Sequence, residues 1–334
     1  MHKNIKVIAF DADDTLWVNE TYFREAELEF AKLLAPYETA NTIDQELFKT
    51  EIRNLELYGY GIKGFMLSMI ECALELSNYK INQKVIYIVH SFLLSNYLPK
   101  NKLVAQILYK SAFKFVAVSE AIKFEMITKY QFDNVVVINN AIIKSHSNSN
   151  TEPAIPSENF ILFFGRIEDS VKNLTLLIDS YQRSILSDNN IKLVILGEGS
   201  DKLKLEEKVK AMGMSENILF LPYISNPSQV ISKAMFSILT SKYEGFPTML
   251  VESLSLGVPV ISVNCQSGPS EIITDAQNGL LVENYNPELI AQAMNRFITQ
   301  NDLYEHCKNN AKNSVEKYNL KYISTHWKNV IEGI

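Results

Sequence analysis

The sequence predicts an α/β protein of two domains, in which helices cover parallel β-sheets. Short apolar runs alternate with stretches that carry an apolar residue every three or four positions, which is the pattern of strands alternating with amphipathic helices. The strand-like runs are apolar at nearly every position, as in parallel sheets covered on both faces. A length of 334 residues is sufficient for about two domains with cores of their own.

Composition excludes several other classes of protein. Apolar side chains make up 47% of the chain and charged ones 21%, which excludes a disordered or collagen-like chain. With 32 basic and 38 acidic residues, the net charge is −6, so nucleic acid is not an expected partner. Three cysteines without a CxxC motif (Cys72, Cys265 and Cys307) indicate a reducing compartment and no structural zinc. The first apolar run is too short for a signal peptide, and we expect a cytoplasmic protein without membrane spans.

The first half of the chain predicts strands joined by helical segments. Apolar residues recur at helical spacing at Phe23, Ala26, Phe30 and Leu33 or Leu34, and again at Phe65, Met69 and Ala73. The expected strands are Lys6–Phe10, Val85–Val89, Phe115–Val118 and Val135–Ile138.

The second half follows a polar stretch over residues 144–158, which has two prolines and no periodicity and is typical of a linker. Strands and helical patterns then alternate regularly. In such folds ligands bind beyond the carboxyl ends of the strands, so those positions are where functional residues are expected. The expected strands are Phe160–Phe164, Lys192–Leu196, Ile218–Leu221, Phe236–Leu239 and Val260–Val263.

The sign of the charge changes near residue 80. Residues 1–79 contain seven basic and fourteen acidic side chains, whereas residues 80–130 contain eight lysines and two glutamates. Two interpretations of the basic stretch from Lys100 to Lys129 stay open. It suits an acidic membrane surface or a phospholipid-linked acceptor, and it is equally compatible with an ordinary solvated face.

Two carboxylates follow the first expected strand. Asp11 and Asp13 stand at alternate positions and therefore point the same way, and two nearby carboxylates suit Mg²⁺. One could attack a phosphorus atom while the other moves a proton. The alternative is a helix N-cap formed by Asp14 or Thr15. The residues alone leave both interpretations open.

Residues 1 to about 80 resemble the start of a haloacid dehalogenase (HAD) superfamily phosphohydrolase, through the apolar strand followed by Asp11, Asp13 and Thr15. The resemblance implies Asp11 as the nucleophile, Asp13 as the general acid/base and Mg²⁺ as the cofactor. It also implies that the helical stretch to Asn78 corresponds to the family's helical cap.

The later motifs of that family are incomplete in this chain. Ser119 imitates the second motif, but no acidic pair follows a later strand, and Gly197–Asp201 imitates the last motif only poorly. Without those groups neither the metal nor the transition state is stabilised. We therefore expect this half-site to be silent.

A second group of candidate residues lies after the linker. Gly165 and Arg166 end a strand, and Lys172 follows at the expected start of a helix. A glycine lets backbone approach a ligand, and two cations at a strand end and a helix N-terminus suit a diphosphate. A solvated Gly-Arg turn is the alternative interpretation.

Two glutamates stand eight positions apart around a tight turn. Glu244 precedes Gly245-Phe246-Pro247, and Pro247 or Thr248 can begin a helix that would carry Glu252 one or two turns further on. A carboxylate suits the vicinal hydroxyls of a sugar, and the amides between the glutamates suit phosphate or sugar oxygens. Apolar neighbours of Glu252 indicate that this helix is packed, which weakens the alternative of two solvated glutamates.

This region resembles the retaining family-4 glycosyltransferases of GT-B fold, from about Val85 to the C-terminus. The resemblance implies an α/β protein with two Rossmann-like domains. The matching motifs, in the family's order, are Gly165-Arg166, Lys172-Asn173, Gly197-Glu198-Gly199, Glu244–Pro247, Glu252, Gly257–Ile261, Gly268–Glu271 and Asn278–Val282.

The resemblance implies specific roles for the donor-site residues. Arg166 and Lys172 would neutralise the pyrophosphate of a nucleotide-sugar, expected to be a UDP-sugar, and Glu252 would hold the ribose. Glu244, as a catalytic residue, and the amides after it would orient the transferred sugar, whose configuration is retained. No metal or other cofactor is implied. The residues expected to bind the donor are Gly165, Arg166, Lys172, Gly197, Gly245, Phe246, Pro247, Thr248 and Glu252.

On the acceptor side, the strand Val85–Val89 ends at His90, which matches a family histidine near the bond being made. A structural histidine is the alternative. The resemblance implies a glycan or lipid-linked acceptor of the cell envelope, and with it a peripheral contact at the inner face of the membrane.

The N-terminus departs from the family, because the first acceptor-side strand and its glycine-rich loop are missing. The chain therefore resembles a fusion near residues 78–85, in which strand Lys6–Phe10 could fill the vacated place in the sheet. We expect a HAD-like segment at 1–80, a partial acceptor domain at 81–143, a linker at 144–158, a donor domain at 159–318 and a C-terminal helix at 319–334.

The leading hypothesis is thus a glycosyltransferase that uses a nucleotide-sugar. Two alternatives remain: a Mg²⁺-dependent phosphatase that uses Asp11, and an impaired fusion that binds nucleotide-sugar without transferring it.

Overall fold

The computed structural model describes residues 7–10, 27–28, 30–58, 62–78, 84–96, 98–110, 112–142, 156, 159–283 and 285–332. The chain divides into two compact units, of which the second comprises residues 118–125 and 137–328 and the first comprises the remainder. Helices α5 (Glu120–Tyr130) and α14 (Leu320–Glu332) each contribute residues to both units.

A four-stranded sheet with the order β1-β2-β3-β4 forms the centre of the first unit. The pairs β1–β2 and β2–β3 are parallel, and Val7 lies opposite Lys84 in the first of them. The N-terminal strand therefore occupies an edge of this sheet. The sequence predicted a strand here that could join the sheet, but not its edge position. Its strands are β1 (Val7–Phe10), β2 (Lys84–Val89), β3 (Lys114–Ala117) and β4 (Val135–Val137), and helix α4 spans Lys102–Leu108.

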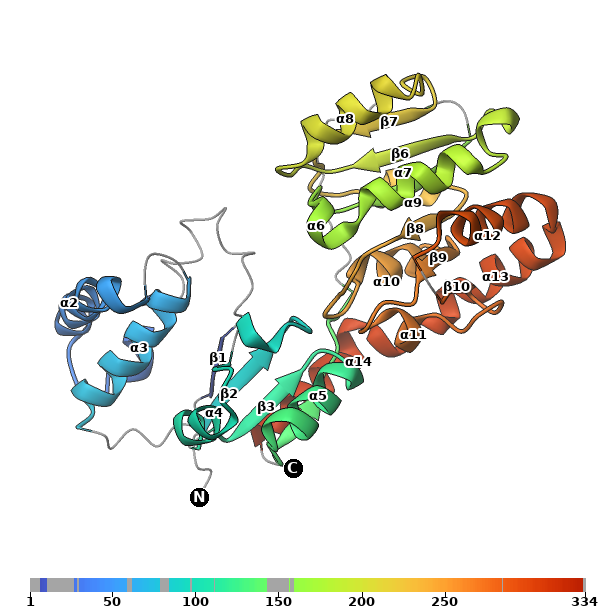
Figure 1. The fold of residues 1–334 in the computed structure, drawn as a ribbon. Coiled ribbons are helices and arrows are strands. Elements are labelled where there is room, and N and C mark those ends of the chain that lie inside the picture. The colour runs from blue at the N-terminus through green and yellow to red at the C-terminus, as the bar shows by residue number, and fades with distance from the viewer. Residues whose placement is uncertain are drawn as a thin grey trace. The chain divides into compact units, whose positions relative to one another are not determined.

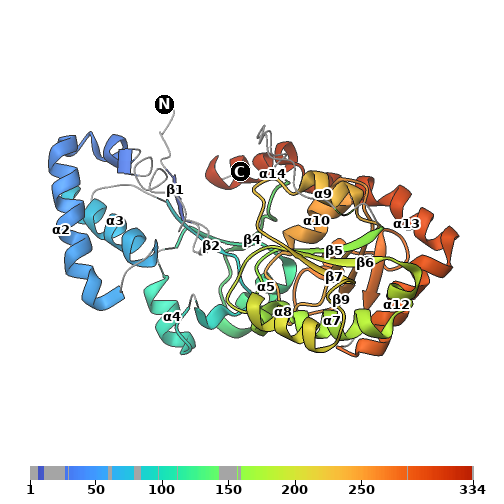
Figure 2. The ribbon, with the colours of Figure 1, turned by 90° about the horizontal axis from the view of Figure 1, so that it is seen from above.

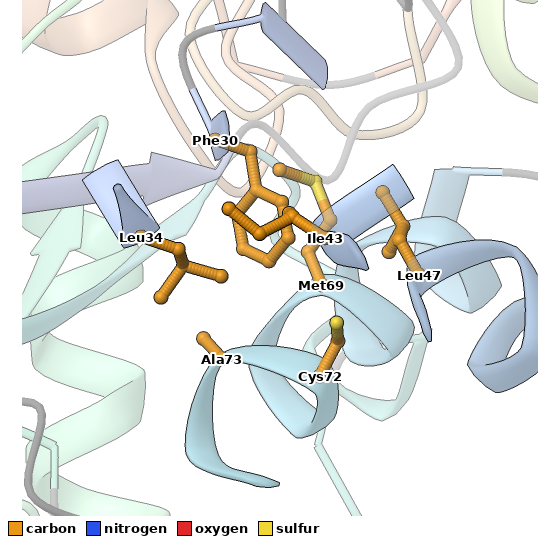
Figure 3. Close-up of a cluster of buried hydrophobic side chains, with 7 residues drawn as sticks. All are labelled: Phe30, Leu34, Ile43, Leu47, Met69, Cys72 and Ala73. Carbon is orange, nitrogen blue, oxygen red and sulfur yellow. The ribbon is translucent and has the colours of Figure 1, made fainter. Parts of the chain in front are cut away.

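Two helices, α2 (Ala40–Tyr58) and α3 (Ile62–Leu76), lie between β1 and β2 in the chain. Figure 3 shows apolar side chains of these helices gathered in one cluster with Phe30 and Leu34, which precede α2 in the chain. Arg53 of α2 also bridges Glu71 and Glu75 of α3, with both nitrogen–oxygen distances at 3.0 Å. This part of the chain therefore has a small core of its own. The cluster consists of Phe30, Leu34, Ile43, Leu47, Met69, Cys72 and Ala73.

The second unit is built on a six-stranded sheet with the order β10-β9-β8-β5-β6-β7, visible in Figure 1. All its strand pairs are parallel. Every residue of Phe160–Phe164 is buried, as expected for a central strand with both faces covered. The strands are β5 (Phe160–Phe164), β6 (Lys192–Leu196), β7 (Ile218–Leu221), β8 (Ser237–Leu239), β9 (Val260–Val263) and β10 (Gly279–Val282).

Helices cover both faces of this sheet. Figure 2 shows α7, α8 and α12 on one face and α9 and α10 on the other. Helix α12 illustrates how the sequence defines an element: Asn286 accepts a hydrogen bond from the amide of Glu288, and Pro287 occupies the first turn. The helices are α6 (Asp169–Lys172), α7 (Leu174–Arg183), α8 (Lys202–Ala211), α9 (Ser228–Lys233), α10 (Thr248–Ser255), α11 (Pro269–Ile272), α12 (Pro287–Thr299) and α13 (Asn301–Ser314).

The order of strands reverses between β5 and β8. From β5 the chain adds β6 and β7 on one side, and then adds β8, β9 and β10 on the other. In such doubly wound sheets, two loops follow the strands at the reversal and turn away from each other. Ligands bind in the crevice between these two loops. The loops after β5 and β8 are those that carry Arg166 and Glu244.

The predicted strands agree with the structure to within one residue at each end. One strand was not predicted: Gly279–Val282 was noted only as a motif, yet it pairs with β9. It begins with Gly279, so only three apolar residues carry its strand pattern. The helix expected to begin at Lys172 is instead divided, because Asn173 adopts a left-handed conformation (φ 53°) between α6 and α7.

The helical cluster leads to a stability prediction. Replacing buried Ile43 by alanine should destabilise α2 and α3 by about 2–4 kcal/mol, because it leaves a cavity in a small core. Ile52 of the same helix is 53% exposed, so Ile52→Ala should cost no more than about 0.5 kcal/mol. Hydrogen exchange of α2 amides measures both, and equal effects would contradict the assigned packing.

Candidate functional site

The candidate site is formed by loops at the carboxyl ends of four strands of the second unit. Gly165 and Arg166 follow β5, and Gly197 follows β6. Glu244 lies between β8 and α10, and Ser267 lies between β9 and α11. All of these loops belong to one unit, and hydrogen bonds join them in turn.

Glycines bring the loops after β5 and β6 into direct backbone contact. A Cβ atom on Gly197, whose φ is +150°, would lie 1.9 Å from the carbonyl oxygen of Gly165. The amide of Ile167 donates to the carbonyl of Glu198 at 2.8 Å, which continues the contact. The glycine at position 197 is thus required for loop packing, apart from any role in binding a ligand.

One ion pair joins the loops after β5 and β8. The Nζ of Lys172 lies 2.7 Å from Oε1 of Glu244, and the two side chains are only 22% and 11% exposed. From the sequence, Lys172 was expected at the pyrophosphate of a donor and Glu244 at its sugar. In the structure the two side chains bind each other. In this arrangement each charge partly neutralises the other before any ligand arrives.

Backbone hydrogen bonds reinforce this connection. The hydroxyl of Thr240 donates to the carbonyls of Lys172 and Asn173, each at 3.1 Å. The amide of Lys242 donates to the carbonyl of Val171 at 2.8 Å. The cation and the carboxylate are therefore held by fixed backbone on both sides, so little ordering is needed when a ligand binds.

The turn Gly245-Phe246-Pro247 is held by the neighbouring loop. The hydroxyl of Ser267 donates to the carbonyl of Gly245 at 3.0 Å. Phe246 is buried, and its ring meets that of Tyr318 edge-on with centroids 5.1 Å apart. Helix α10 begins at Thr248, as predicted, and no side chain caps its N-terminus. Its first amides therefore have no capping side chain, and α10 follows the loop after β8.

Glu252 lies in the second turn of α10, where the sequence placed it. Its neighbours Val251 and Leu254 are buried, whereas Leu256 at the helix end is 40% exposed. Burial raises the pKa of Glu252 from 4.5 to about 7. Among the residues that the structure describes, none donates a hydrogen bond or an ion pair to this carboxylate. It is therefore a partly buried acid that a hydroxyl donor would stabilise.

Arg166 remains largely open to solvent. Its side chain is 58% exposed, and its nearest carboxylate is that of Glu168, at 3.6 Å. An exposed surface pair of this length contributes little to stability. The guanidinium is thus available for an anionic ligand without loss of a strong contact.

Hydrogen bonds of Ser119 and Glu271 were not expected from the sequence. The Ser119 hydroxyl caps α5 through the amide of Ile122 and lies 2.8 Å from the hydroxyl of Ser267. The carboxylate of Glu271 accepts hydrogen bonds from the amides of Glu120 and Ala121. The capping pattern of a serine before a helix could have predicted the first contact, but not the long-range ones.

Other candidate residues lie elsewhere. His90 directly follows β2 in the first unit. Asp11, Asp13 and Thr15 lie outside the described residues. Within the described part of the chain no group of three or more His, Cys, Asp and Glu side chains could hold a metal ion, and no helix is long and apolar enough to cross a membrane.

The loops of the candidate site lie in a region of the chain that matches a known protein family. Residues 146–314, half of the chain, match the family described as Glycosyl transferases group 1. The chain belongs to the group 1 glycosyl transferases. The matched residues include all four loops of the candidate site. Ser119, which contacts Ser267, lies before them.

Two curated relatives of this glycosyl transferase chain are sugar transferases, as their names state. A poly(ribitol-phosphate) alpha-N-acetylglucosaminyltransferase of Staphylococcus aureus is 26% identical over 219 residues, which are 65% of this chain and 43% of that protein. An alpha-N-acetylgalactosaminyltransferase of Campylobacter jejuni, named for a diphospho-undecaprenol acceptor, is 35% identical over 161 residues. Those residues are 48% of this chain and 43% of the relative. The chain thus spans less than half the length of both.

Solved structures show the same fold. HepE of Anabaena in complex with UDP has a TM-score of 0.67 and 18% sequence identity, and the match covers 80% of this chain and 76% of that protein. This likeness confirms the GT-B-like α/β fold with parallel sheets that the sequence predicted. The comparisons do not support the phosphohydrolase-like N-terminus, which stays a prediction because its motif lies outside the described residues.

The packing of the glycine loops leads to a second stability prediction. Gly197→Ala should destabilise the second unit by about 3 kcal/mol, because the new Cβ overlaps a backbone oxygen at a positive φ. Gly213→Ala is the matched control: its φ is also positive (+71°), but nothing lies within 4 Å, so about 1 kcal/mol is expected. Urea unfolding monitored by hydrogen exchange in β5 and β6 distinguishes them. Similar losses would contradict the close loop packing.

Proposed function

We propose that this chain transfers a sugar from a nucleotide-sugar, a UDP-sugar, to a cell-envelope polysaccharide or lipid-linked acceptor, with retention of configuration. The observation that supports it most directly is the pairing of Lys172 with Glu244 at the strand reversal, eight positions before Glu252, whose carboxylate has no partner among the described residues. Membership in the group 1 glycosyl transferases supports the same reaction class.

The donor would be held at its two ends by different chemistry. Arg166 and Lys172 are cations that suit the two phosphates, and the first amides of α10 add dipoles of the same sign. The carboxylate of Glu252 would accept hydrogen bonds from the ribose hydroxyls. That contact relieves the unfavourable burial of a carboxylate without a donor.

Bond breaking leaves negative charge on the nucleoside diphosphate. Lys172 and Arg166 would stabilise this charge as it develops, which is the largest usual contribution to such catalysis. Lys172 is paired with Glu244 in the absence of a donor. When the phosphates attract the lysine away, the carboxylate of Glu244 would be released and could turn toward the transferred sugar. Retention would result if the acceptor hydroxyl attacks the anomeric carbon from the face that the diphosphate leaves. A diphosphate oxygen would then accept the proton of that hydroxyl.

The class of acceptor follows from the relatives. Their names specify poly(ribitol-phosphate) and a diphospho-undecaprenol glycan, both anionic polymers or lipids. His90, at the carboxyl end of β2, is the residue proposed to act beside the acceptor.

Titration with UDP tests the proposed donor site. Glu252→Ala and Arg166→Ala should each weaken UDP binding roughly 10- to 100-fold, because each removes one charge-assisted contact. Isothermal titration calorimetry measures the affinities. The control is Glu207→Ala, which removes an exposed carboxylate of α8 and should leave affinity unchanged. Absence of UDP binding by the unaltered protein would overturn the proposal.

The raised pKa of Glu252 predicts a pH dependence of donor binding. The folded-state pKa of about 7 lies above the ordinary 4.5, so the folded protein holds this proton more tightly than the unfolded chain does. The contribution of Glu252 to the free energy of unfolding is therefore lost as the pH rises through 7. Ribose hydroxyls favour the charged form. UDP-N-acetylglucosamine, whose diphosphate does not titrate in this range, should therefore bind about tenfold more tightly at pH 8 than at pH 6.

The conservative variant isolates this effect. Glu252→Gln keeps the shape of the side chain but does not titrate, so its affinity should be constant between pH 6 and pH 8. An equal slope in both proteins would assign the titration to another group and remove the proposed contact with the ribose.

A further inference from the structure

A chain of hydrogen bonds runs through two buried serines to the turn that follows Glu244. The hydroxyl of Ser267 donates to the carbonyl of Gly245 at 3.0 Å, and the hydroxyls of Ser119 and Ser267 lie 2.8 Å apart. Ser119 in turn accepts a hydrogen bond from the amide of Ile122, in the first turn of α5. Ser119 is fully buried and Ser267 is only 2% exposed, so solvent is kept from both hydroxyls.

The direction of this chain is determined by its two ends. A carbonyl oxygen can only accept a hydrogen bond, and a hydroxyl has a single proton to donate. Ser267 gives its proton to Gly245, so Ser119 is the donor between the two serines. All three hydrogen bonds therefore point toward Gly245, and bonds that are aligned in this way polarise one another.

Further contacts hold the serines in place. The carboxylate of Glu271 in α11 accepts hydrogen bonds from the amides of Glu120 and Ala121, at 2.9 and 3.1 Å, which fixes the start of α5 beside α11. A Cβ atom on Gly268, whose φ is +94°, would overlap with the ring of Pro247, so the backbone before α11 packs closely against the turn. All of these residues belong to the second unit.

The peptide that receives this chain has an unused donor. The carbonyl of Gly245 and the amide of Phe246 belong to one peptide unit, so drawing electron density toward the oxygen makes the amide a stronger donor. Among the described residues, none accepts a hydrogen bond from the amide of Phe246. Phe246 follows Glu244 by two positions, in the turn before α10. A strengthened donor without a partner suits an oxygen atom of a bound ligand.

We propose that Ser267 and Ser119 are positioning residues of the sugar-transfer reaction. Through the peptide of Gly245 they would strengthen the amide of Phe246 as a donor to a hydroxyl oxygen of the transferred sugar. The inference rests on the proposed function and adds a specific consequence to it. The two serines contribute to affinity for the sugar of the donor, but not to affinity for its UDP portion.

Calorimetric titration of the full chain compares UDP with UDP-glucose, UDP-galactose, UDP-N-acetylglucosamine and UDP-N-acetylgalactosamine. The UDP-sugar that the unaltered protein binds most tightly is used for the variants. Ser267→Ala should weaken binding of that UDP-sugar about 3- to 10-fold and leave UDP affinity unchanged, because one hydrogen bond to the sugar is weakened. Ser119→Ala keeps the bond between Ser267 and Gly245, so it should cause a smaller loss in the same direction and tests the proposal even where Ser267→Ala unfolds.

Two further variants separate this role from a merely structural one. Ser237→Ala is the matched control, because it breaks a 2.8 Å hydrogen bond between the fully buried hydroxyls of Ser237 and Ser253, and it should change neither affinity. The double variant of Ser119→Ala with Ser267→Ala should bind both ligands as Ser267→Ala alone does, since Ser119 acts only through Ser267.

The amide of Phe246 can also be observed without a ligand. In nuclear magnetic resonance spectra of phenylalanine-labelled protein, Ser119→Ala should shift the Phe246 amide nitrogen upfield, because the Gly245 carbonyl is less polarised, and Ser237→Ala should not. An unchanged Phe246 resonance in Ser119→Ala overturns the proposal. So do equal losses of UDP and UDP-sugar affinity in Ser267→Ala, or additive losses in the double variant. Absence of UDP binding by the unaltered protein overturns the proposed function, whereas the resonance still decides whether the serines polarise this peptide.

Discussion

The ion pair between Lys172 and Glu244 is the constraint on which the candidate site depends. It joins the loops after β5 and β8, the two strands where the sheet reverses its order. Such loops would otherwise turn away from each other. Thr240 and Lys242 add backbone contacts across the same junction, so the pair is part of a rigid framework and is not merely a contact between two flexible side chains.

Glu252 contrasts with this pair. Lys172 and Glu244 satisfy each other, whereas Glu252 is buried enough to raise its pKa to about 7 without a described partner. A titratable group whose pKa is strongly shifted by burial is a candidate for contact with a ligand. The candidate site therefore combines one acid that is already neutralised by a cation with one that has no partner among the described residues, and the two differ although they stand only eight positions apart.

The first unit joins two parallel strands through a helical connection. Strand β1 pairs in parallel with β2, and the chain between them forms α2 and α3, whose side chains make a separate cluster. A parallel pair requires a long connection, and α2 and α3 lie within that connection. Strand β2 in turn pairs in parallel with β3.

The sequence by itself determined every strand but Gly279–Val282, the start of α10 and the position of Glu252 one or two turns into that helix, because these depend on local periodicity and on the turn residues around Pro247. It also indicated the family through the order of its glycine and glutamate motifs. Only the tertiary structure decided that Lys172 and Glu244 bind each other, that Gly197 is needed for contact with Gly165, and that Ser119 reaches Ser267. Each of these features joins residues far apart in the chain, and local sequence patterns carry no information about which distant atoms meet.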